Sequence, residues 1–228
     1  MTVYANCNFA QREFVLFDFD GTLANTKPGL VRVATQVLSD FGMSPEEIGD
    51  ASRLVGPPFP EAFSLVYGLS AADAVQVTRA FRALYDTVGP EDFPLFPGGQ
   101  AMLESLKAAG KKLSTASSKR EVQVMHMLRA QGIIHLFDAV IGKQNDAQGS
   151  KPFVIGRALQ ELGATAENTV MVGDRNYDVA GAHELGIPCV CVLFGTATKQ
   201  ELLDAQVDAL VHSNEELTAL LTTGSCER

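Results

Sequence analysis

The sequence predicts an α/β protein: a Rossmann-like parallel sheet with helices on both faces, and an all-helical segment inserted after the first strand. The chain has 228 residues, of which 46% are hydrophobic, so it can bury a substantial core. The apolar run Phe14–Phe17 is short and bounded by polar residues, as expected of a buried strand. After Pro97, strand-like and helix-like segments alternate, which is typical of a parallel sheet covered by helices.

Residues 25–94 interrupt this alternation and show only helical patterns. Leu30, Val33, Val37 and Phe41 recur at helical spacing, and a second helix is predicted to begin at Ser70. We therefore predict a core domain formed by residues 1–24 and 95–228, and a helical cap domain formed by residues 25–94.

The remaining elements follow from periodicity and from their start and stop residues. Ser213 with Glu216 three positions later forms a candidate capping box for the last helix. The predicted helices cover 98–109, 119–131, 152–162 and 177–185, and the predicted strands cover 112–116, 137–141, 169–172, 188–193 and 209–211.

Charge and cysteine usage restrict the possible partners. The formal net charge of −9 argues against a nucleic acid or an anionic membrane as partner. The polar N-terminus and the absence of a run of about 18 apolar residues indicate a cytoplasmic protein. The four cysteines lack zinc spacing and are expected to be free thiols. Cys189 and Cys191 are expected to point to opposite sides of a strand.

Two acids, Asp18 and Asp20, follow the first strand directly and precede the turn at Gly21. Two carboxylates at the end of a buried strand repel each other and resist burial. Such a pair is tolerated when a cation lies beside it or when one acid holds a proton. The pair therefore indicates chemistry, although Asp20 could instead cap a turn.

Three further polar features stand at the end of a strand or the start of a helix. They are Ser117-Ser118-Lys119, Lys151-Pro152, and Gly173-Asp174-Arg175-Asn176-Tyr177-Asp178. In parallel sheets the carboxyl ends of neighbouring strands meet at one edge, so these features are expected to converge with the acid pair.

The four features together resemble the motifs of the haloacid dehalogenase superfamily. DFDGTL matches the pattern DxDGT, Ser117 matches the serine or threonine of the second motif, Lys151 the lysine of the third, and GDRNYD the pattern GDxxxD. Their order agrees over nearly the whole chain, and the helical insertion is similar to a subtype I cap. The overall pattern is most similar to phosphoglycolate-phosphatase-like hydrolases.

The resemblance implies an Mg²⁺-dependent phosphoryl transfer. It makes Asp18 the nucleophile that carries the phosphoryl group, and Asp20 the acid and base, with a pKa raised by enclosure. It implies that Mg²⁺ is held by Asp18, the backbone carbonyl of Asp20, Asp174 and Asp178; Asp178 could act through water or orient Lys151 instead.

The same resemblance assigns the phosphate contacts. Lys151, Ser117 and the backbone N–H groups near Gly21 and Ser118 are expected to bind the phosphoryl oxygens. Plainer roles remain open, because Ser117 could only cap the next helix and Lys151 could be a solvated side chain. Lys119 opens a helix and is expected at the rim of the site, outside the phosphate contacts.

Substrate recognition is expected to depend on the cap. Lys27, Arg32 and Arg53 could hold a substrate anion, although each could equally be a solvated charge. Gly56, in the run Gly56-Pro57-Pro58, is similar to a cap loop that faces the site, but it could be a simple turn between helices.

The predicted activity is an Mg²⁺-dependent phosphatase for a small phosphorylated metabolite, such as phosphoglycolate, a sugar phosphate or a nucleotide. The presence of Asp20 opposes a dehalogenase or a phosphonatase. A β-phosphoglucomutase-like mutase uses the same acid pair and stays open. A non-enzymatic relative would usually lack Asp18, Asp20 or Asp174, and all three are present. The leaving group and the oligomeric state cannot be derived from these motifs.

Overall fold

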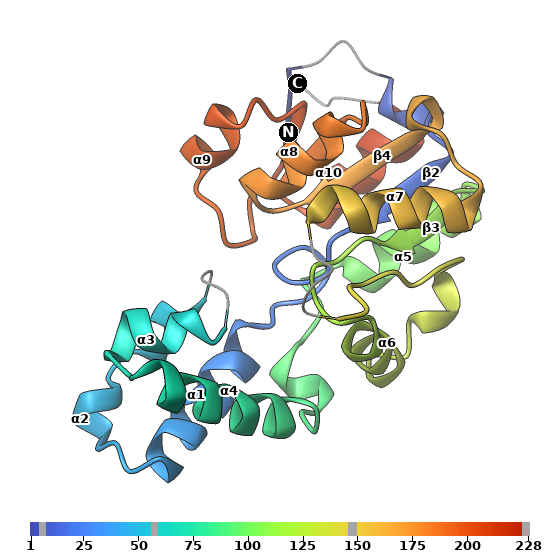
Figure 1. The fold of residues 1–228 in the computed structure, drawn as a ribbon. Coiled ribbons are helices and arrows are strands. Elements are labelled where there is room, and N and C mark those ends of the chain that lie inside the picture. The colour runs from blue at the N-terminus through green and yellow to red at the C-terminus, as the bar shows by residue number, and fades with distance from the viewer. Residues whose placement is uncertain (5–7, 56–58, 146–149, 225–228) are drawn as a thin grey trace. The chain divides into compact units, whose positions relative to one another are not determined.

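The computed structural model describes residues 1–4, 8–55, 59–145 and 150–224 (Figure 1). Its contacts divide the chain into two compact units. The first, called here the sheet unit, contains residues 1–25 and 95–228, and the second, called here the helical unit, contains residues 26–94. The sheet unit holds the whole six-stranded sheet.

The sheet confirms the predicted α/β fold, with one antiparallel addition. Its strand order is β1-β6-β5-β4-β2-β3, and every pairing is parallel except that of β1 with β6. The edge strand β1 was not predicted, because two residues are too few to show a period. The strands are β1 (Thr2–Val3), β2 (Phe14–Phe17), β3 (Lys112–Thr115), β4 (Thr169–Gly173), β5 (Cys189–Val192) and β6 (Ala209–Val211).

The register of the central strand β2 brings the predicted motifs to one edge. Phe17 pairs with Thr115 of β3 on one side and with Val172 of β4 on the other. The residues that follow these three strands therefore emerge side by side at their carboxyl ends. The chain order reverses at β2, and such a switch point is where α/β sheets bind ligands.

Helices cover both faces of the sheet. Side chains of α7 (Lys151–Leu162), α8 (Asn176–Glu184) and α9 (Lys199–Asp204) share one apolar cluster with Leu16 and Met171 of the central strands. Alternate strand residues point to the other face, where α5 (Gly99–Ala108) and α10 (Asn214–Thr222) pack against each other. The sheet unit also contains α6 (Glu121–Ala130) and the short 3-10 turns η1 (Phe9–Gln11), η4 (Ile134–Leu136) and η5 (Ala166–Asn168).

The prediction of a strand over 137–141 was wrong. In this segment only Ala139 forms an isolated bridge, to Ser114 of β3. At the next position outward, the Thr115 hydroxyl accepts a hydrogen bond from Ile141 N (2.8 Å) and donates one to Ile141 O (2.9 Å). A side chain thus replaces part of the backbone ladder, and the segment follows β3 without forming a regular strand.

Two smaller sequence expectations also need correction. The Ser213 hydroxyl accepts from Glu216 N as predicted, but the Glu216 carboxylate accepts from His212 N (2.8 Å) and not from Ser213, so only half of the capping box forms. Cys189 and Cys191 point to the same face, with sulfur atoms 3.9 Å apart, because residues two apart in a strand share a side. Both thiols are free and buried.

The helical unit contains no strand in its described residues. Its two longest helices, α1 (Lys27–Asp40) and α4 (Ala71–Tyr85), lie where apolar periodicity predicted helices, and they pack against each other. The bidentate ion pair of Arg32 with buried Asp92 joins α1 to the end of the unit. The other elements are α2 (Pro45–Ile48), α3 (Glu61–Tyr67), η2 (Ala51–Leu54) and η3 (Pro90–Asp92).

Each helix in the described part of the chain is too short or too polar to cross a membrane.

Candidate active site

Asp18 is the first residue after the central strand β2 and continues the backbone hydrogen bonding between β2 and β4. Its N–H donates to Val172 O at 2.9 Å, and its side chain is 7% exposed. Burial raises the pKa of Asp18 from 3.8 to about 7; Lys151 opposes this rise, and the neighbouring carboxylates add to it. In the absence of a metal ion, the ionised form of this carboxylate is therefore unfavourable in the folded protein.

Asp20 differs from the enclosed acid that the sequence analysis expected. Its side chain is 39% exposed, although its Oδ1 atom is covered. That oxygen lies 3.1 Å from Lys119 Nζ, so the two groups form an ion pair, but the angles do not allow a hydrogen bond. Lys119 was expected only at the rim. It is 11% exposed at its side chain and faces the acid directly.

Gly21 has a structural role that replaces its expected phosphate contact. Its N–H already donates to Ala24 O at 2.9 Å, so this group is not open to a phosphate. Gly21 has φ +77°, which glycine adopts without strain. A Cβ atom at this position would lie 2.3 Å from Asp174 Oδ2. The residue therefore allows the turn after Asp20 to approach Asp174 closely.

Ser117 and Ser118 follow β3 beside the acid pair. Ser117 is buried, and its hydroxyl oxygen accepts from Lys119 N at 3.2 Å, which leaves the hydroxyl proton free to donate. Ser117 N donates to Ile141 O. Ser118 is half-buried, and within the described part of the chain its N–H forms no hydrogen bond. Ser117 thus closes the turn before α6 and can still donate to an anion.

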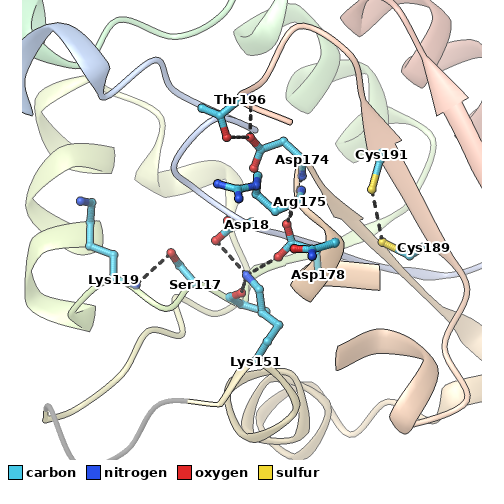
Figure 2. Close-up of polar contacts among 12 residues, drawn as sticks. Asp18, Ser117, Lys119, Lys151, Asp174, Arg175, Asp178, Cys189, Cys191 and Thr196 are labelled. Atoms are coloured by element: carbon cyan, nitrogen blue, oxygen red, sulfur yellow. Dashed lines mark hydrogen bonds and ion pairs between the residues drawn. The ribbon is translucent and has the colours of Figure 1, made fainter. Parts of the chain in front are cut away.

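Lys151, the first residue of α7, is the central cation of the site. Its side chain is 3% exposed, and Nζ lies 3.0 Å from Asp18 Oδ1, 2.7 Å from Asp178 Oδ1 and 2.9 Å from Ala116 O (Figure 2). Burial lowers the pKa of Lys151, but the two carboxylates outweigh burial and raise it. A Cβ at Gly181 would lie 2.8 Å from Lys151 Cγ, so this glycine allows α8 to pack closely.

Asp174 is fixed by a residue that the sequence analysis did not select. Its Oδ2 accepts hydrogen bonds from Thr196 N at 2.7 Å and from the Thr196 hydroxyl at 2.6 Å (Figure 2). Its Oδ1 is buried and has no hydrogen-bond partner in the described residues. Burial raises the pKa of Asp174 to about 6, although the two bonds from Thr196 act in the opposite direction.

Asp178 stands in the first turn of α8 with both carboxylate oxygens engaged. Oδ2 accepts from the backbone N–H groups of Asp174 (3.1 Å) and Arg175 (3.0 Å), and Oδ1 contacts Lys151. A Cβ at Gly173 would lie 2.4 Å from Asp178 Cγ, so glycine is required there. These contacts make Asp178 an organiser of the loop and of Lys151.

The three buried acids form a geometry that suits a divalent cation. One carboxylate oxygen each from Asp18, Asp174 and Asp178 lies within 4.8 Å of the others. Oδ1 of Asp174 is buried and has no hydrogen-bond or ion-pair partner in the described residues, whereas Oδ1 of Asp18 and Oδ1 of Asp178 form an ion pair with Lys151. Buried polar atoms are normally paired, and hard cations such as Mg²⁺ bind carboxylate oxygens. The donor set therefore fits Mg²⁺.

The residues selected in the helical unit have local partners in the structure. Arg32 is held by Asp92, while Arg53 donates to Asp50 O and lies over the ring of Tyr67, 5.5 Å from its centroid. Lys27 is the first residue of α1 and interacts electrostatically with Asp50. Gly56 lies outside the described residues. Substrate binding by these residues stays a prediction.

The fold and site together define an α/β protein in which a buried lysine forms ion pairs with a cluster of acids, at the switch point of a mostly parallel sheet. A family model described as haloacid dehalogenase-like hydrolase matches residues 15–192. The chain belongs to this family, which confirms the resemblance stated above.

The chain is also similar to individual curated proteins and solved structures. The chain is 37% identical to the tyrosine-protein kinase PtkA of Mycobacterium tuberculosis over 80% of its length and 62% of that relative's length. It is 31% identical to a plasmid-encoded phosphoglycolate phosphatase of Cupriavidus necator, over 91% of this chain and 92% of the relative. The crystal structure of a predicted phosphatase from Clostridium acetobutylicum superposes with a TM-score of 0.80 at 30% identity, covering 92% and 98% of the two chains.

Proposed function

We propose that this protein hydrolyses a small phosphate monoester through a phosphoryl group carried on Asp18, with Mg²⁺ as cofactor. The observation that carries the proposal is the position of Lys151, whose ammonium group is shared by Asp18 and Asp178 beside the cluster of buried carboxylate oxygens. A relative named phosphoglycolate phosphatase, similar over nearly its whole length, supports the same reaction class.

Asp18 and Asp174, with the backbone carbonyl of Asp20, are the groups that would hold the ion. Bound there, Mg²⁺ would neutralise charge on the transferring phosphoryl group and act as a Lewis acid. Asp178 acts differently in our proposal. Because both its oxygens already have partners, it orients Lys151 and the backbone of the loop and does not coordinate directly.

Asp18 must be ionised to attack phosphorus. Burial opposes that charge, and the ammonium group of Lys151, 3.0 Å from Asp18 Oδ1, favours it. The attack forms an O–P bond to Asp18 as the bond to the leaving oxygen breaks, and water later displaces the phosphoryl group from the carboxylate. Two displacements thus replace one difficult step.

Asp20 is positioned to move the protons of both steps. The exposed part of its side chain can reach an incoming group, while Lys119 holds its Oδ1 from the other side. Asp20 would protonate the leaving alkoxide and then deprotonate the attacking water. The Ser117 hydroxyl and the Ser118 N–H, together with Lys151, would donate to the phosphoryl oxygens.

The physiological partner in this proposal is a small phosphorylated metabolite. The net charge of −9 opposes binding to nucleic acid or to an anionic membrane surface. The buried free thiols Cys189 and Cys191 support a reducing, cytoplasmic compartment. The helical unit would select the leaving group.

The acceptor of the phosphoryl group distinguishes the alternatives. Water gives a phosphatase, a sugar hydroxyl gives a mutase, and a tyrosine hydroxyl would give the activity named for the Mycobacterium tuberculosis relative. Our proposal makes water the acceptor, and the substrate panel below distinguishes it from the other two.

A substrate panel tests the proposal directly. Phosphate release from phosphoglycolate, sugar phosphates and nucleoside monophosphates would be measured with and without Mg²⁺, for the wild type and for Asp18→Asn. We expect Mg²⁺-dependent release that Asp18→Asn abolishes. Release that survives this substitution would rule out the assigned nucleophile. Conversion of glucose 1-phosphate to glucose 6-phosphate without release would identify a mutase.

A further inference from the structure

We propose that Thr196 is the positioning residue of the metal centre: it holds Asp174 so that one carboxylate oxygen is fixed by hydrogen bonds and the other is presented to Mg²⁺. This inference rests on the proposed function, because it assigns Asp174 to the ion. Thr196 belongs to none of the motifs that identified the site.

The geometry separates the two oxygens of Asp174. Thr196 donates twice to Oδ2, from its backbone N–H at 2.7 Å and from its hydroxyl at 2.6 Å. Oδ1 remains buried without a hydrogen bond in the described residues. Hydrogen bonds to a carboxylate are short and strong, so this pair restricts rotation of the group. The oxygen without a partner then has one defined position.

The loop that carries Thr196 is itself held close to the site. A Cβ at Gly195 would lie 2.4 Å from Asp174 Cβ and 2.5 Å from Gly21 O. Gly195 and Gly21 therefore approach Asp174 from two segments, where a larger residue would collide. This packing leaves the carboxylate little freedom to change its rotamer.

Both ends of the same loop are anchored in the sheet unit. On one side of Thr196, Phe194 packs against Phe96, with ring centroids 4.7 Å apart. On the other side, Thr198 caps α9 by accepting from Glu201 N, and the Glu201 carboxylate accepts from Arg175 Nε. The loop is thus tied both to the start of α5 and to the residue that follows Asp174. Thr196 is held in place before any ion binds.

This arrangement resembles the outer-sphere support of other metal centres, where partners of the ligands set their orientation. Removal of such a partner typically weakens metal affinity by about 10–100-fold. Substitution of the Thr196 hydroxyl leaves the backbone N–H in place, so we expect an effect near the lower end of that range.

The test is calorimetric titration of the whole protein with Mg²⁺ in the absence of substrate. Thr196→Val removes the hydroxyl at nearly constant volume, and Thr196→Ser restores it. We expect the Kd for Mg²⁺ to rise about 10-fold in Thr196→Val and to stay near the wild-type value in Thr196→Ser. Thr218→Val is the matched control, because it removes a threonine hydroxyl that donates to Asn214 O within α10 and does not contact Asp174 or the loop of Thr196.

The outcomes separate positioning from folding. A purely structural role would lower the metal-free Tm but leave the Mg²⁺ Kd unchanged, and this result for Thr196→Val would overturn the inference. An equal loss of affinity in Thr218→Val would overturn it as well. If Thr196→Val does not fold, Thr196→Ala takes its place in the same titration. Failure of the wild type to bind Mg²⁺, or full binding by Asp174→Asn, would instead refute the proposed metal site on which the inference rests.

Discussion

Asp18→Asn should make the metal-free protein more stable at alkaline pH while abolishing its activity. The side chain of Asp18 is 7% exposed and lies beside three other acids, so its negative charge is unfavourable despite Lys151. Asparagine has nearly the same shape and carries no charge. Functional sites often retain such destabilising groups because the chemistry requires them.

The size of the effect follows from the pKa of Asp18. Each tenfold change in proton affinity corresponds to about 1.4 kcal/mol, so a rise from 3.8 to about 7 amounts to roughly 4 kcal/mol. The folded state binds the proton more tightly than the unfolded state. Protonation of Asp18 therefore stabilises the folded state. This contribution to the free energy of unfolding is complete below pH 3.8 and is lost as the pH rises through about 7.

Urea denaturation in EDTA at several pH values measures this effect. The chain has no tryptophan, so far-ultraviolet circular dichroism is the suitable signal. We expect the free energies of unfolding of wild type and Asp18→Asn to converge near pH 4 and to diverge by about 2–4 kcal/mol at pH 8, with the variant more stable. Saturating Mg²⁺ should reduce the difference, because a cation compensates the charge of the wild-type site.

Asp138→Asn provides a control of opposite sign in the same unit. The carboxylate of Asp138 forms ion pairs with Lys107 and Lys112 and accepts a hydrogen bond from Leu113 N. Burial raises the pKa of Asp138, but these contacts outweigh burial and lower it. Its substitution should therefore destabilise the protein at pH 8. Equal stability of Asp18→Asn and wild type at pH 8, or a less stable variant, would refute the electrostatic reasoning.

Three further perturbations test separate parts of the structure. Lys151→Met leaves the buried carboxylates of Asp18 and Asp178 without their cation. In urea titrations it should lower the free energy of unfolding by about 3–5 kcal/mol at pH 8, with partial recovery at lower pH. An unchanged stability would contradict the ion pairing of Lys151 with these acids. Gly195→Ala places a Cβ 2.4 Å from Asp174 Cβ and should weaken Mg²⁺ binding at least about 10-fold in calorimetry, whereas Gly156→Ala, with open space around it, should bind normally. Arg32→Met should lower stability by about 1–3 kcal/mol because its buried partner loses two hydrogen bonds. Its KM should not change, and a large rise in KM would show that Arg32 binds substrate.

The sequence predicted the sheet and the gathering of acids because both depend on short-range patterns. Apolar strands that end in Asp18 or Asp174 can be recognised without knowing their neighbours. Parallel pairing then determines that their ends meet at one edge. Lys151 followed the same logic, since it opens a helix beside that edge.

The missed features depend on contacts that no local pattern encodes. Thr196 follows a predicted strand end, which was a usable signal, but its bonds to Asp174 arise from the packing of two loops. The contact of Lys119 with Asp20 depends on a side-chain direction that position alone does not determine. The segment 137–141 has strand-like residues, yet the Thr115 hydroxyl accepts the hydrogen bond of Ile141 N, which a regular strand would give to a backbone carbonyl.

The central claim is that Asp18 carries the phosphoryl group, and trapping that group tests it most directly. Asp20→Asn should slow hydrolysis of the intermediate, because the base that activates water is missing. This variant would be mixed with Mg²⁺ and a phosphate monoester that the wild type hydrolyses. The reaction would be quenched in acid, and the protein would be digested and analysed by mass spectrometry. We predict a phosphoryl group on the peptide that contains Asp18, and none in the double variant Asp18→Asn with Asp20→Asn. A phosphoryl group on any other residue, or an intermediate that persists without Asp18, would contradict the account.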